Sequence, residues 1–281
     1  QRFRFSSDAE VDLSRKPKEQ VVMKRNKRTA SFSFNDTNWS RQTYLSGKGE
    51  IKADHNVSSV WRKGYTGKNV TVAVVDDGLR YTHVEFKGRY SQDLSYDHVD
   101  NDHDPAPASY KNEDGHGTNC AGVIAADANN GNCGVGVAYD AKIAGIRLFS
   151  AGLPNDTEAA KAFYPFHGHG IDIFSNSWGP PDNGVTIAGP GPLTLLALQN
   201  GTSKGRGGLG SIYVFSAGNG GGFRDDNCAF NGFVNNIYTI PVAAVDEDAR
   251  PTRSSESCSA IMTSAYSSNL VRSGNINLSQ V

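Results

Sequence analysis

The chain has 281 residues, 31 glycines and a formal net charge of −1 at pH 7. That length is enough for one large domain or two small ones with a substantial buried core. Charge is unevenly distributed: residues 1–28 hold nine Lys/Arg against four Asp/Glu, which leaves 19 Lys/Arg against 25 Asp/Glu in residues 29–281. An acidic body disfavours nucleic acid as a partner and suits basic ligands or metal ions.

The sequence contains no run of 18 apolar residues and no apolar signal segment, so neither a transmembrane helix nor a leader is predicted, and we interpret the start at Gln1 as incomplete or processed. None of the four cysteines forms a CxxC pair, which argues against a zinc cluster. The chain does hold seven Asn-x-Ser/Thr sequons, an abundance typical of secreted glycoproteins, in which disulfides form. They begin at Asn35, Asn38, Asn56, Asn69, Asn155, Asn200 and Asn277.

Strand-like and helix-like segments alternate from Trp61 onward. The valine-rich run 69–76 predicts a buried parallel strand, and the small and apolar residues of 116–127 have helical spacing. The later segments predict strands over 141–148, 170–178, 210–218 and 236–244, and helices over 156–166, with Asp156 as N-cap, and 192–201, with Pro near its start. This alternation predicts a doubly wound α/β fold with helices on both faces of a parallel sheet, whose function gathers at the carboxyl ends of the strands.

Polar groups follow the ends of several predicted strands. Asp76 ends the first strand, and His116 opens the helix that crosses to the next one. A buried carboxylate bonded to one ring nitrogen of a histidine is the base half of a catalytic triad, and Gly115 and Gly117 would leave room for a substrate backbone. Asn219, among glycines after another strand, suits an oxyanion hole, although a glycine-rich turn with a left-handed asparagine is the alternative.

Three other motifs give weaker signals. The GRGGLG run at 205–210 precedes a strand, which is the wrong context for a dinucleotide loop. His167 and His169 have no nearby third ligand that would complete a metal site. The acidic stretch with Asp97, Asp100, Asp102 and Asp104 favours a hard cation such as calcium over a solvated loop, without matching EF-hand spacing.

Several of these stretches resemble known proteases. "VAVVDDG", "HGTNCAG", "NSWGP" and "SAGNGG" resemble the subtilisin-like serine proteases, and "QTYLSG", "GYTGKNV" and "GRGGLGSIYVFSAGNGG" resemble the kexin- and furin-type proprotein convertases. The resemblance implies a subtilisin-like fold without its C-terminal part. It also implies that residues 1–28 are the end of a basic inhibitory propeptide, cleaved after Arg28, and that residues 29–281 are a partial peptidase domain.

Roles for individual residues follow from this resemblance. It implies that Asp76 is the triad acid, His116 the base and Asn219 the oxyanion donor. The pocket for the arginine next to the scissile bond is matched by Asp182. The pocket for the basic residue one position before that arginine is matched by Asp77, Glu113 and Asp114. Three calcium sites are implied, one with Asp182, Asp226 and Glu256, one with Asp36, Glu85, Asn130, Asn132 and Gly134, and one with Asp97, Asp102 and Asp104. Cys228 and Cys258 match a family disulfide.

The sequence departs from the family pattern at several positions. Asn231 stands where the family has an aspartate in the arginine pocket, and Ala188 stands where furin-like members have an acid that reads a more distant basic residue. The family's nucleophile lies in a Gly-Thr-Ser-Ala motif that this sequence does not contain. Its one Gly-Thr-Ser string, at 201–203, matches a non-catalytic stretch, and Cys133 has no counterpart for its family partner.

The resemblance therefore implies a calcium-dependent serine endopeptidase of the secretory pathway that cleaves precursor proteins after paired basic residues. Its expected partners are those precursors and its own propeptide, with no nucleic acid and no membrane segment in this chain. We expect the 281 residues as printed to be inactive for want of the nucleophile. The alternative is a truncated pseudoprotease that acts as a binding or regulatory partner.

Overall fold

We describe the protein from a computed structural model, in which the chain divides into two units, residues 1–31 and 32–281. The description covers residues 32–46, 54–108, 115–150, 152–164 and 170–267. Arg28 and the whole predicted propeptide segment lie outside these ranges, as do Glu113, Asp114, His167 and His169.

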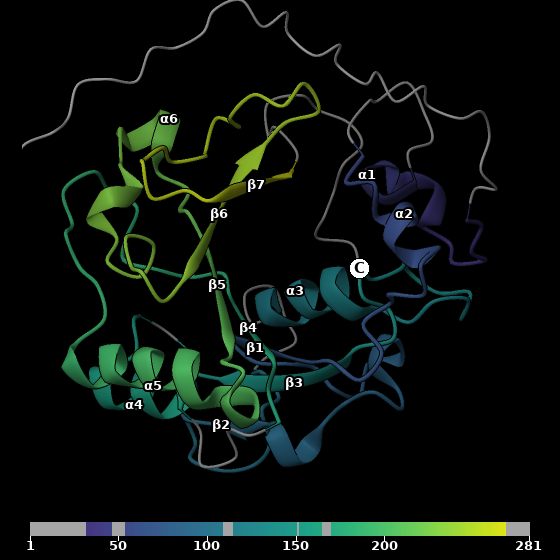
Figure 1. The fold of residues 1–281 in the computed structure, drawn as a ribbon, viewed down its shortest axis with the longest axis horizontal. Coiled ribbons are helices and arrows are strands. Elements are labelled where there is room, and N and C mark those ends of the chain that lie inside the picture. Colours follow the sequence, from purple (N-terminus) through teal and green to yellow (C-terminus); the bar gives the residue numbers. More distant parts are fainter. Residues whose placement is uncertain (1–31, 47–53, 109–114, 151, 165–169, 268–281) are drawn as a thin grey trace, which may run out of the picture. The chain divides into compact units, whose positions relative to one another are not determined.

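Among the described residues, seven parallel strands form one sheet in the order β2-β3-β1-β4-β5-β6-β7 (Figure 1). The strands are β1 (Thr71–Asp76), β2 (Tyr96–Asp97), β3 (Lys142–Arg147), β4 (Ile173–Asn176), β5 (Ile212–Ser216), β6 (Ile240–Val245) and β7 (Thr263–Tyr266). The α-helices are α1 (Thr43–Ser46), α2 (Val57–Trp61), α3 (His116–Ala125), α4 (Asp156–Phe163), α5 (Pro192–Gly208) and α6 (Gly221–Arg224). The predicted parallel α/β fold is confirmed.

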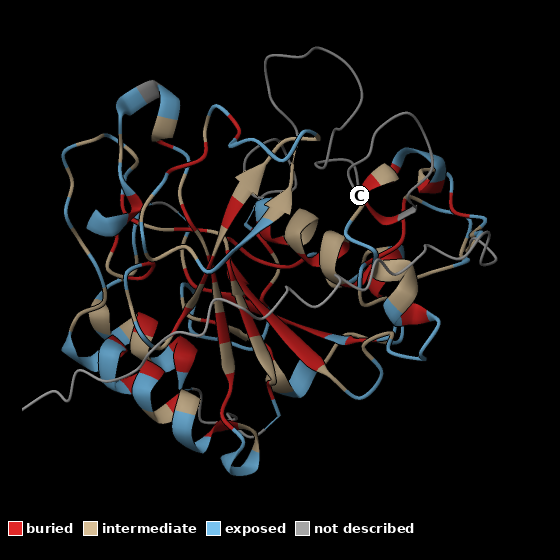
Figure 2. Ribbon diagram, turned by 45° about the horizontal axis from the view of Figure 1, so that its top comes forward, coloured by how far each residue is buried: buried red, intermediate tan, exposed pale blue. Residues whose placement is uncertain are grey.

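The alternation of side chains along β1 explains why helices cover both faces. All six residues of β1 are buried. Val72 and Val74 pack in one cluster with Ala121 of α3, whereas Ala73 and Val75 belong to a second cluster with residues of α4 and α5. Figure 2 shows the buried residues gathered along the strands and the inward sides of the helices. Successive strand residues point to opposite faces, so a strand that is buried throughout must be covered on both of them.

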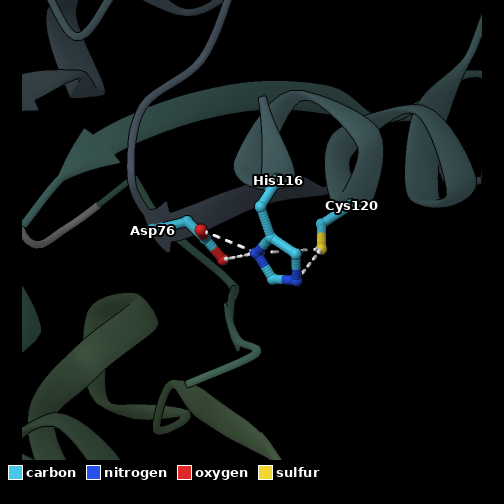
Figure 3. Close-up of side chains that lie close together, drawn as sticks. All are labelled: Asp76, His116 and Cys120. Carbon is cyan, nitrogen blue, oxygen red and sulfur yellow. Dashed lines mark hydrogen bonds and ion pairs between the residues drawn. The ribbon is translucent and has the colours of Figure 1, made fainter. Parts of the chain in front are cut away.

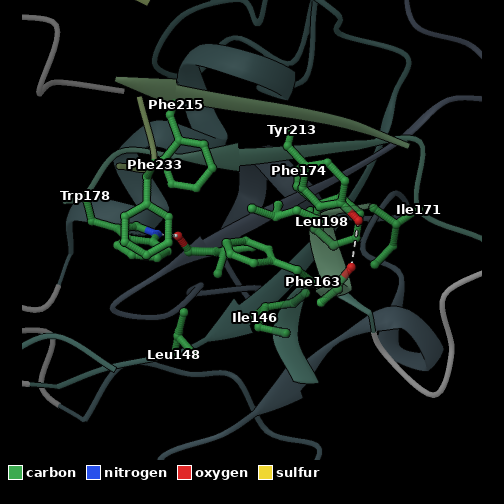
Figure 4. Close-up of a cluster of buried hydrophobic side chains, with 14 of the residues drawn as sticks. Ile146, Leu148, Phe163, Ile171, Phe174, Trp178, Leu198, Tyr213, Phe215 and Phe233 are labelled. Atoms are coloured by element: carbon green, nitrogen blue, oxygen red, sulfur yellow. Dashed lines mark hydrogen bonds between the residues drawn. The ribbon is translucent and has the colours of Figure 1, made fainter. Parts of the chain in front are cut away.

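The cluster under α4 and α5 is rich in aromatic side chains, as Figure 4 shows. The Trp178 ring stacks parallel to that of Phe163 with centroids 6.1 Å apart, and the Trp178 Nε1–H donates to the carbonyl of Val75 at 2.9 Å. The Tyr213 hydroxyl donates to the Phe163 carbonyl at 2.7 Å. Both buried polar tips are thus satisfied: Tyr213 joins β5 to α4, and Trp178 joins the segment after β4 to β1.

The predicted N-cap of α4 was wrong by one residue. Asn155 caps α4, in a capping box with Glu158. The Asp156 carboxylate instead accepts from the backbone N–H groups of Leu193 and Thr194 at the start of α5, at 3.0 and 2.9 Å. Gly191, the N-cap of α5, has no side chain to offer, so a carboxylate from the neighbouring helix supplies the missing acceptor. The two helices are joined where they begin.

Candidate active site

Parallel strands bring the predicted catalytic residues to one edge of the sheet. Asp76 is the last residue of β1, Asp182 follows β4, and Asn219 follows β5. β4 lies between β1 and β5, so the ends of the outer two are roughly 10 Å apart, or two spacings of ~4.8 Å. His116 is the first residue of α3, which packs on the face of β1.

Asp76 and His116 form a direct pair (Figure 3). The His116 Nδ1 lies 2.8 and 3.0 Å from the two carboxylate oxygens of Asp76. The Asp76 side chain is 1% exposed and the His116 side chain 54% exposed, so a buried anion orients a ring that faces solvent. The hydrogen bond to Asp76, then that to Cys120, raises the pKa of His116 to about 11. The pair therefore stabilises the imidazolium, the form a base adopts after taking a proton.

The Cys120 thiol is the neighbour of the other ring nitrogen. Its Sγ lies 3.9 Å from His116 Nε2 and 4.0 Å from Nδ1, one helical turn along α3. Cys120 and Cys133 both carry free thiols.

Asp77 has a structural role that the sequence analysis missed. Its Oδ2 accepts from the backbone N–H of His116 at 3.0 Å, and its Oδ1 accepts from that of Gly117 at 2.8 Å. The N-cap of α3 is Gly115, which has no side-chain acceptor, so Asp77 caps the helix from the adjacent strand. Burial raises the pKa of Asp77, while the two backbone N–H groups hold it down. Asp77 thus orients the base by anchoring the backbone that carries it.

The close packing of α3 on β1 explains Gly117. A Cβ at this position would lie 2.4 Å from the carbonyl oxygen of Gly78 and 2.8 Å from the Cβ of Asp76. Gly117 is therefore required by contact within the chain rather than by room for a substrate, whereas the space beside Gly115 is open. Without this approach, the ring of His116 could not lie against Asp76.

Three carboxylates from separate segments converge next to Asn219. Asp182, Asp226 and Glu256 each place one oxygen within 4.8 Å of the others. The Asn219 backbone N–H donates to Asp182 at 3.0 Å, and the Gly220 N–H donates to Glu256 at 3.0 Å. Gly218, at a φ of +108°, passes so close to Glu256 that an added Cβ would lie 2.3 Å from a carboxylate oxygen. The predicted oxyanion donor and the acidic cluster therefore share one backbone turn.

This cluster has the chemistry that calcium requires. Burial is the main cause that raises the pKa of Glu256, to about 7, and the carboxylates of Asp182 and Asp226 raise it further. Three carboxylates with no cationic side chain among the groups that act on Glu256 resist ionising together, and a hard divalent cation relieves that repulsion. The described residues fit a calcium ion held by these three side chains.

The second predicted calcium set also comes together, around a buried glutamate. Glu85 is fully buried, its Oε2 accepts from the Asn130 side chain at 3.0 Å, and its Oε1 has no hydrogen-bond partner among the described residues. The Asp36 carboxylate accepts from the backbone N–H groups of Asn129 and Asn130. Burial, then the Asp36 charge, raises the pKa of Glu85 against the bonds that lower it. An unpartnered buried carboxylate oxygen fits a cation ligand.

The loop of this second set continues through Asn132 and Gly134. The Asn132 backbone N–H donates to Asn130 Oδ1 at 2.7 Å, and its side chain donates to the Asn130 carbonyl. Gly134 lies against the side chain of Gln42, whose Oε1 accepts from the Val135 N–H at 2.7 Å.

The third predicted set is arranged differently. Arg147 Nη1 lies 2.6 Å from Asp97 Oδ2 and 2.6 Å from Asp100 Oδ2, and the other Asp97 oxygen accepts two backbone N–H groups. Asp102 and Asp104 accept from backbone N–H groups within their own loop. The Asp97 carboxylate is therefore already neutralised by a cation of the chain.

Asn231 and Ala188 lie side by side near the segment that leads to Asp182. Their backbones form an isolated parallel bridge, and the Asn231 Oδ1 accepts from the Phe233 N–H at 2.9 Å. The Asn231 Nδ2 lies 2.7 Å from where a Cβ on Gly179 would be. Ala188 lines a cavity of about 250 Å³ with Leu153, Pro154, Trp178 and Phe233 among its other walls. Another cavity of about 530 Å³, between α4 and α5, contains none of the predicted site residues.

Cys228 and Cys258 form a disulfide across a sequence separation of 30 residues. Asp226 and Glu256 each lie two positions before one of these cysteines. The bond thus links the two segments that supply two of the three clustered carboxylates.

Among the described residues, no helix has both the length and the apolar character needed to cross a bilayer.

Comparisons with known proteins identify the family. Residues 67–280 match the model of the Subtilase family. Proprotein convertase subtilisin/kexin type 5 of Homo sapiens is 41% identical over 261 residues, which cover 89% of this chain and 14% of that protein. Furin of Homo sapiens is 41% identical over 265 residues, which cover 94% of this chain and 32% of furin. The chain thus spans a third or less of the length of these relatives.

A solved structure supports the fold. The crystal structure of the serine protease of Aeromonas sobria matches with a TM-score of 0.71 at 22% identity, covering 88% of this chain and 46% of that one. The predicted resemblance to kexin- and furin-type convertases is confirmed by the curated relatives. Since the family model spans most of the sequence and the fold agrees, the chain belongs to the subtilase family.

Proposed function

We propose that this chain is part of a calcium-dependent serine endopeptidase that cleaves precursor proteins after paired basic residues. The observation that carries the proposal is the buried Asp76 carboxylate on Nδ1 of a solvent-facing His116. In this arrangement Nε2 is the nitrogen that takes a proton from a hydroxyl nucleophile, and Asp76 stabilises the resulting imidazolium. The exposed Asn219 side chain, after β5, would donate to the oxyanion as the carbonyl is attacked.

The nucleophile is the component that the described residues do not supply. None of them places a hydroxyl in hydrogen-bonding contact with His116. The Gly-Thr-Ser string at 201–203 lies within α5, where the Ser203 hydroxyl donates to the Gln199 carbonyl at 2.8 Å. We therefore propose that the 281 residues alone do not cleave peptides, and that the activity belongs to a longer protein in which a serine faces Nε2.

Substrate preference follows from charge and shape around Asp182. Its carboxylate, next to Asn219, supplies the negative charge that would attract an arginine at the cut. The basic residue before the cut would be read by Asp77 together with Glu113 and Asp114. The cavity beside Ala188 has apolar walls in Leu153 and Phe233, and its one acidic residue, Asp156, already accepts backbone N–H groups of α5, which supports weak selection for a more distant arginine.

Calcium would be held by the Asp182, Asp226 and Glu256 carboxylates and, at a second site, by Asp36 and Glu85. Bound there, the ion would supply positive charge that lets the acidic residues pack together without repulsion. We further propose a secretory location, in keeping with the convertase relatives and the sequons. Residues 1–28 would be the end of a propeptide released by cleavage after Arg28, and residues 29–281 part of the peptidase domain.

The test uses the full-length protein and a fluorogenic peptide that ends in Arg-Arg. We expect serine-inhibitor-sensitive cleavage, and a loss of about 10⁴-fold in kcat for Asp76→Asn, since the wrong tautomer of His116 then faces the nucleophile. Asp248→Asn, which alters an exposed acid far along the chain, is the matched control. Binding of dibasic peptides without any turnover would favour the pseudoprotease alternative.

A further inference from the structure

The seven sequons differ in what the structure does with their asparagines. In five of them the asparagine side chain is hydrogen-bonded, is half-buried, or lies outside the described residues. Asn56 and Asn69 are exposed, and among the described residues neither side-chain amide forms a hydrogen bond. We infer that Asn56 and Asn69 are the positions that carry N-linked glycans. The inference rests on the proposed secretory location and deepens it.

Both asparagines are exposed and have a left-handed backbone conformation. Asn56 has a φ of 56° and Asn69 a φ of 66°, both in the left-handed region, which asparagine tolerates better than most residues. At Asn56 the backbone is held by local bonds: its N–H donates to Asp54 at 2.7 Å, and its carbonyl accepts from the Ser59 hydroxyl at 2.7 Å. Asn69 precedes β1, where the turn is closed by the Val70 N–H donating to the Gly67 carbonyl. The backbone thus needs nothing from either amide.

The other sequons commit their asparagines to the fold. The Asn155 Oδ1 accepts from the Glu158 N–H as the cap of α4, and the Asn35 Oδ1 accepts from the Gly131 N–H in the loop beside the second predicted calcium set. Asn38 is half-buried, and Asn200 is half-buried in the wall of the cavity between α4 and α5. A sugar chain on Asn38 or Asn200 would have to project from a half-buried side chain. On Asn35 or Asn155, which are exposed, it would be attached to an amide whose oxygen the fold already uses as an acceptor.

Position relative to the active site separates the candidates further. Asn69 precedes the amino end of β1, and Asp76 is its last residue, so five residue rises of ~3.3 Å place the two ends roughly 17 Å apart. Asn155 opens α4 just after β3 and lies beside Asp156, which lines the cavity with Ala188. A glycan at Asn69 would leave that edge open to a protein substrate, whereas one at Asn155 would crowd it.

N-glycosylation transfers an oligosaccharide to the side-chain amide of the asparagine. A bond forms between the asparagine Nδ2 and the anomeric carbon of an oligosaccharide that is carried on a lipid diphosphate. The bond from that carbon to the diphosphate oxygen breaks, the amide loses one proton, and nothing is oxidised or reduced. The hydroxyls of Ser58 and Thr71 complete the two sequons that the transferase recognises.

The experiment expresses the full-length protein, with its own N-terminal segment, in cultured eukaryotic cells. Secreted protein is treated with peptide-N-glycanase in ¹⁸O-water, which converts each glycosylated asparagine to labelled aspartate, and peptides are read by mass spectrometry. We expect label at positions 56 and 69. Asn56→Asp and Asn69→Asp should each remove one glycan and the double variant both, while aspartate still tolerates the left-handed backbone.

Matched variants test the motif without touching the asparagine. Ser58→Ala should remove the glycan at Asn56, and Ser58→Thr should keep it. Secreted protein with label only at other sequons, or with none, would overturn the inference and leave the secretory location intact. A chain that is retained in the cytosol without any glycan would overturn both the inference and the proposed location.

Discussion

Two acidic regions of the molecule show how differently carboxylates can be accommodated. Asp97 and Asp100 share the buried guanidinium of Arg147, which comes from a neighbouring strand. Asp182, Asp226 and Glu256 converge with no cationic side chain among the groups that act on Glu256. In the denser acidic run of the sequence, the chain itself thus supplies a cation for Asp97 and Asp100, whereas Asp102 and Asp104 accept from backbone N–H groups. A cluster calls for a metal ion only where the fold leaves its charge unbalanced.

Replacing Arg147, the cation that the chain itself supplies to Asp97, should have the largest effect on stability. Arg147 is 4% exposed and Asp97 1% exposed, so Arg147→Met would leave a buried, uncompensated carboxylate. We expect the free energy of unfolding to fall by about 3–5 kcal/mol, measured by denaturant titration. The control is Arg250→Met, because Arg250 pairs with Asp248 on the surface at 3.6 Å and should cost no more than ~1 kcal/mol. Equal losses in the two variants would show that Asp97 does not depend on Arg147 for charge compensation.

Calcium should stabilise the folded chain through the acidic cluster of Asp182, Asp226 and Glu256. At a free concentration of about 100 times its Kd, an ion that binds only the folded chain adds ~2.7 kcal/mol to the free energy of unfolding. Glu256→Gln should remove most of the gain contributed by that cluster, whereas Asp100→Asn should leave it unchanged, since Asp100 already has Arg147. Thermal melts with calcium and with a chelator measure this. If Asp100→Asn instead abolished the stabilisation by calcium, the ion would bind the acidic run around Asp97 and not the cluster around Glu256.

Position 231 tests how charge balance near the unbalanced cluster affects a cationic substrate. In the full-length protein, Asn231→Asp should strengthen binding of arginine at the cut by about 1 kcal/mol, the size of a charge-assisted hydrogen bond in a partly wet site. The measurement is kcat/KM on matched Arg and Lys peptides. An unchanged ratio for both peptides would show that Asn231, although it lies beside Gly179, does not face the substrate.

The smallest expected effect on stability comes from the pair of Asp76 and the protonated ring of His116. Asp76→Asn should lower the pKa of His116 from about 11 toward its ordinary value of 6.5, as followed by NMR titration of the ring. Because the folded pKa is raised, the stability from this pair is fully present below pH 6.5 and is lost as the pH rises through about 11. His116 is half exposed, so the loss should stay within ~1 kcal/mol. A native ring that titrates near 6.5 would contradict the pairing.

Much of the fold could be predicted because its signals are local. The apolar run that became β1 and the Pro–helix start at 192 each depend on a few adjacent residues. β7, Thr263–Tyr266, escaped prediction because this edge strand has two exposed and two half-buried residues and therefore no apolar run. The α4 cap was misassigned because Asn155 and Asp156 are equally good caps, and only α5 shows where the Asp156 carboxylate is needed.

The site could be predicted in its residues but not in its balance of charges. Asp76 and His116 stand at a strand end and a helix start, which parallel topology brings to one edge. The Asp97–Arg147 pair joins residues 50 positions apart, and nothing in the acidic run indicates which strand supplies the guanidinium. The capping role of Asp77 depends on how closely α3 approaches β1, a distance that follows from packing around Gly117.

The disulfide between Cys228 and Cys258 bears on how the acidic cluster is assembled. It lies two residues beyond Asp226 and Glu256, so it keeps two mutually repelling carboxylates together whether or not an ion is present. Closing a loop of 30 residues limits the unfolded chain by about 3.6 kcal/mol in the chain-entropy model. An oxidised chain would therefore have two of the three carboxylates held near each other before an ion binds. A chain folded under reducing conditions would have to use calcium both to assemble the cluster and to fill it.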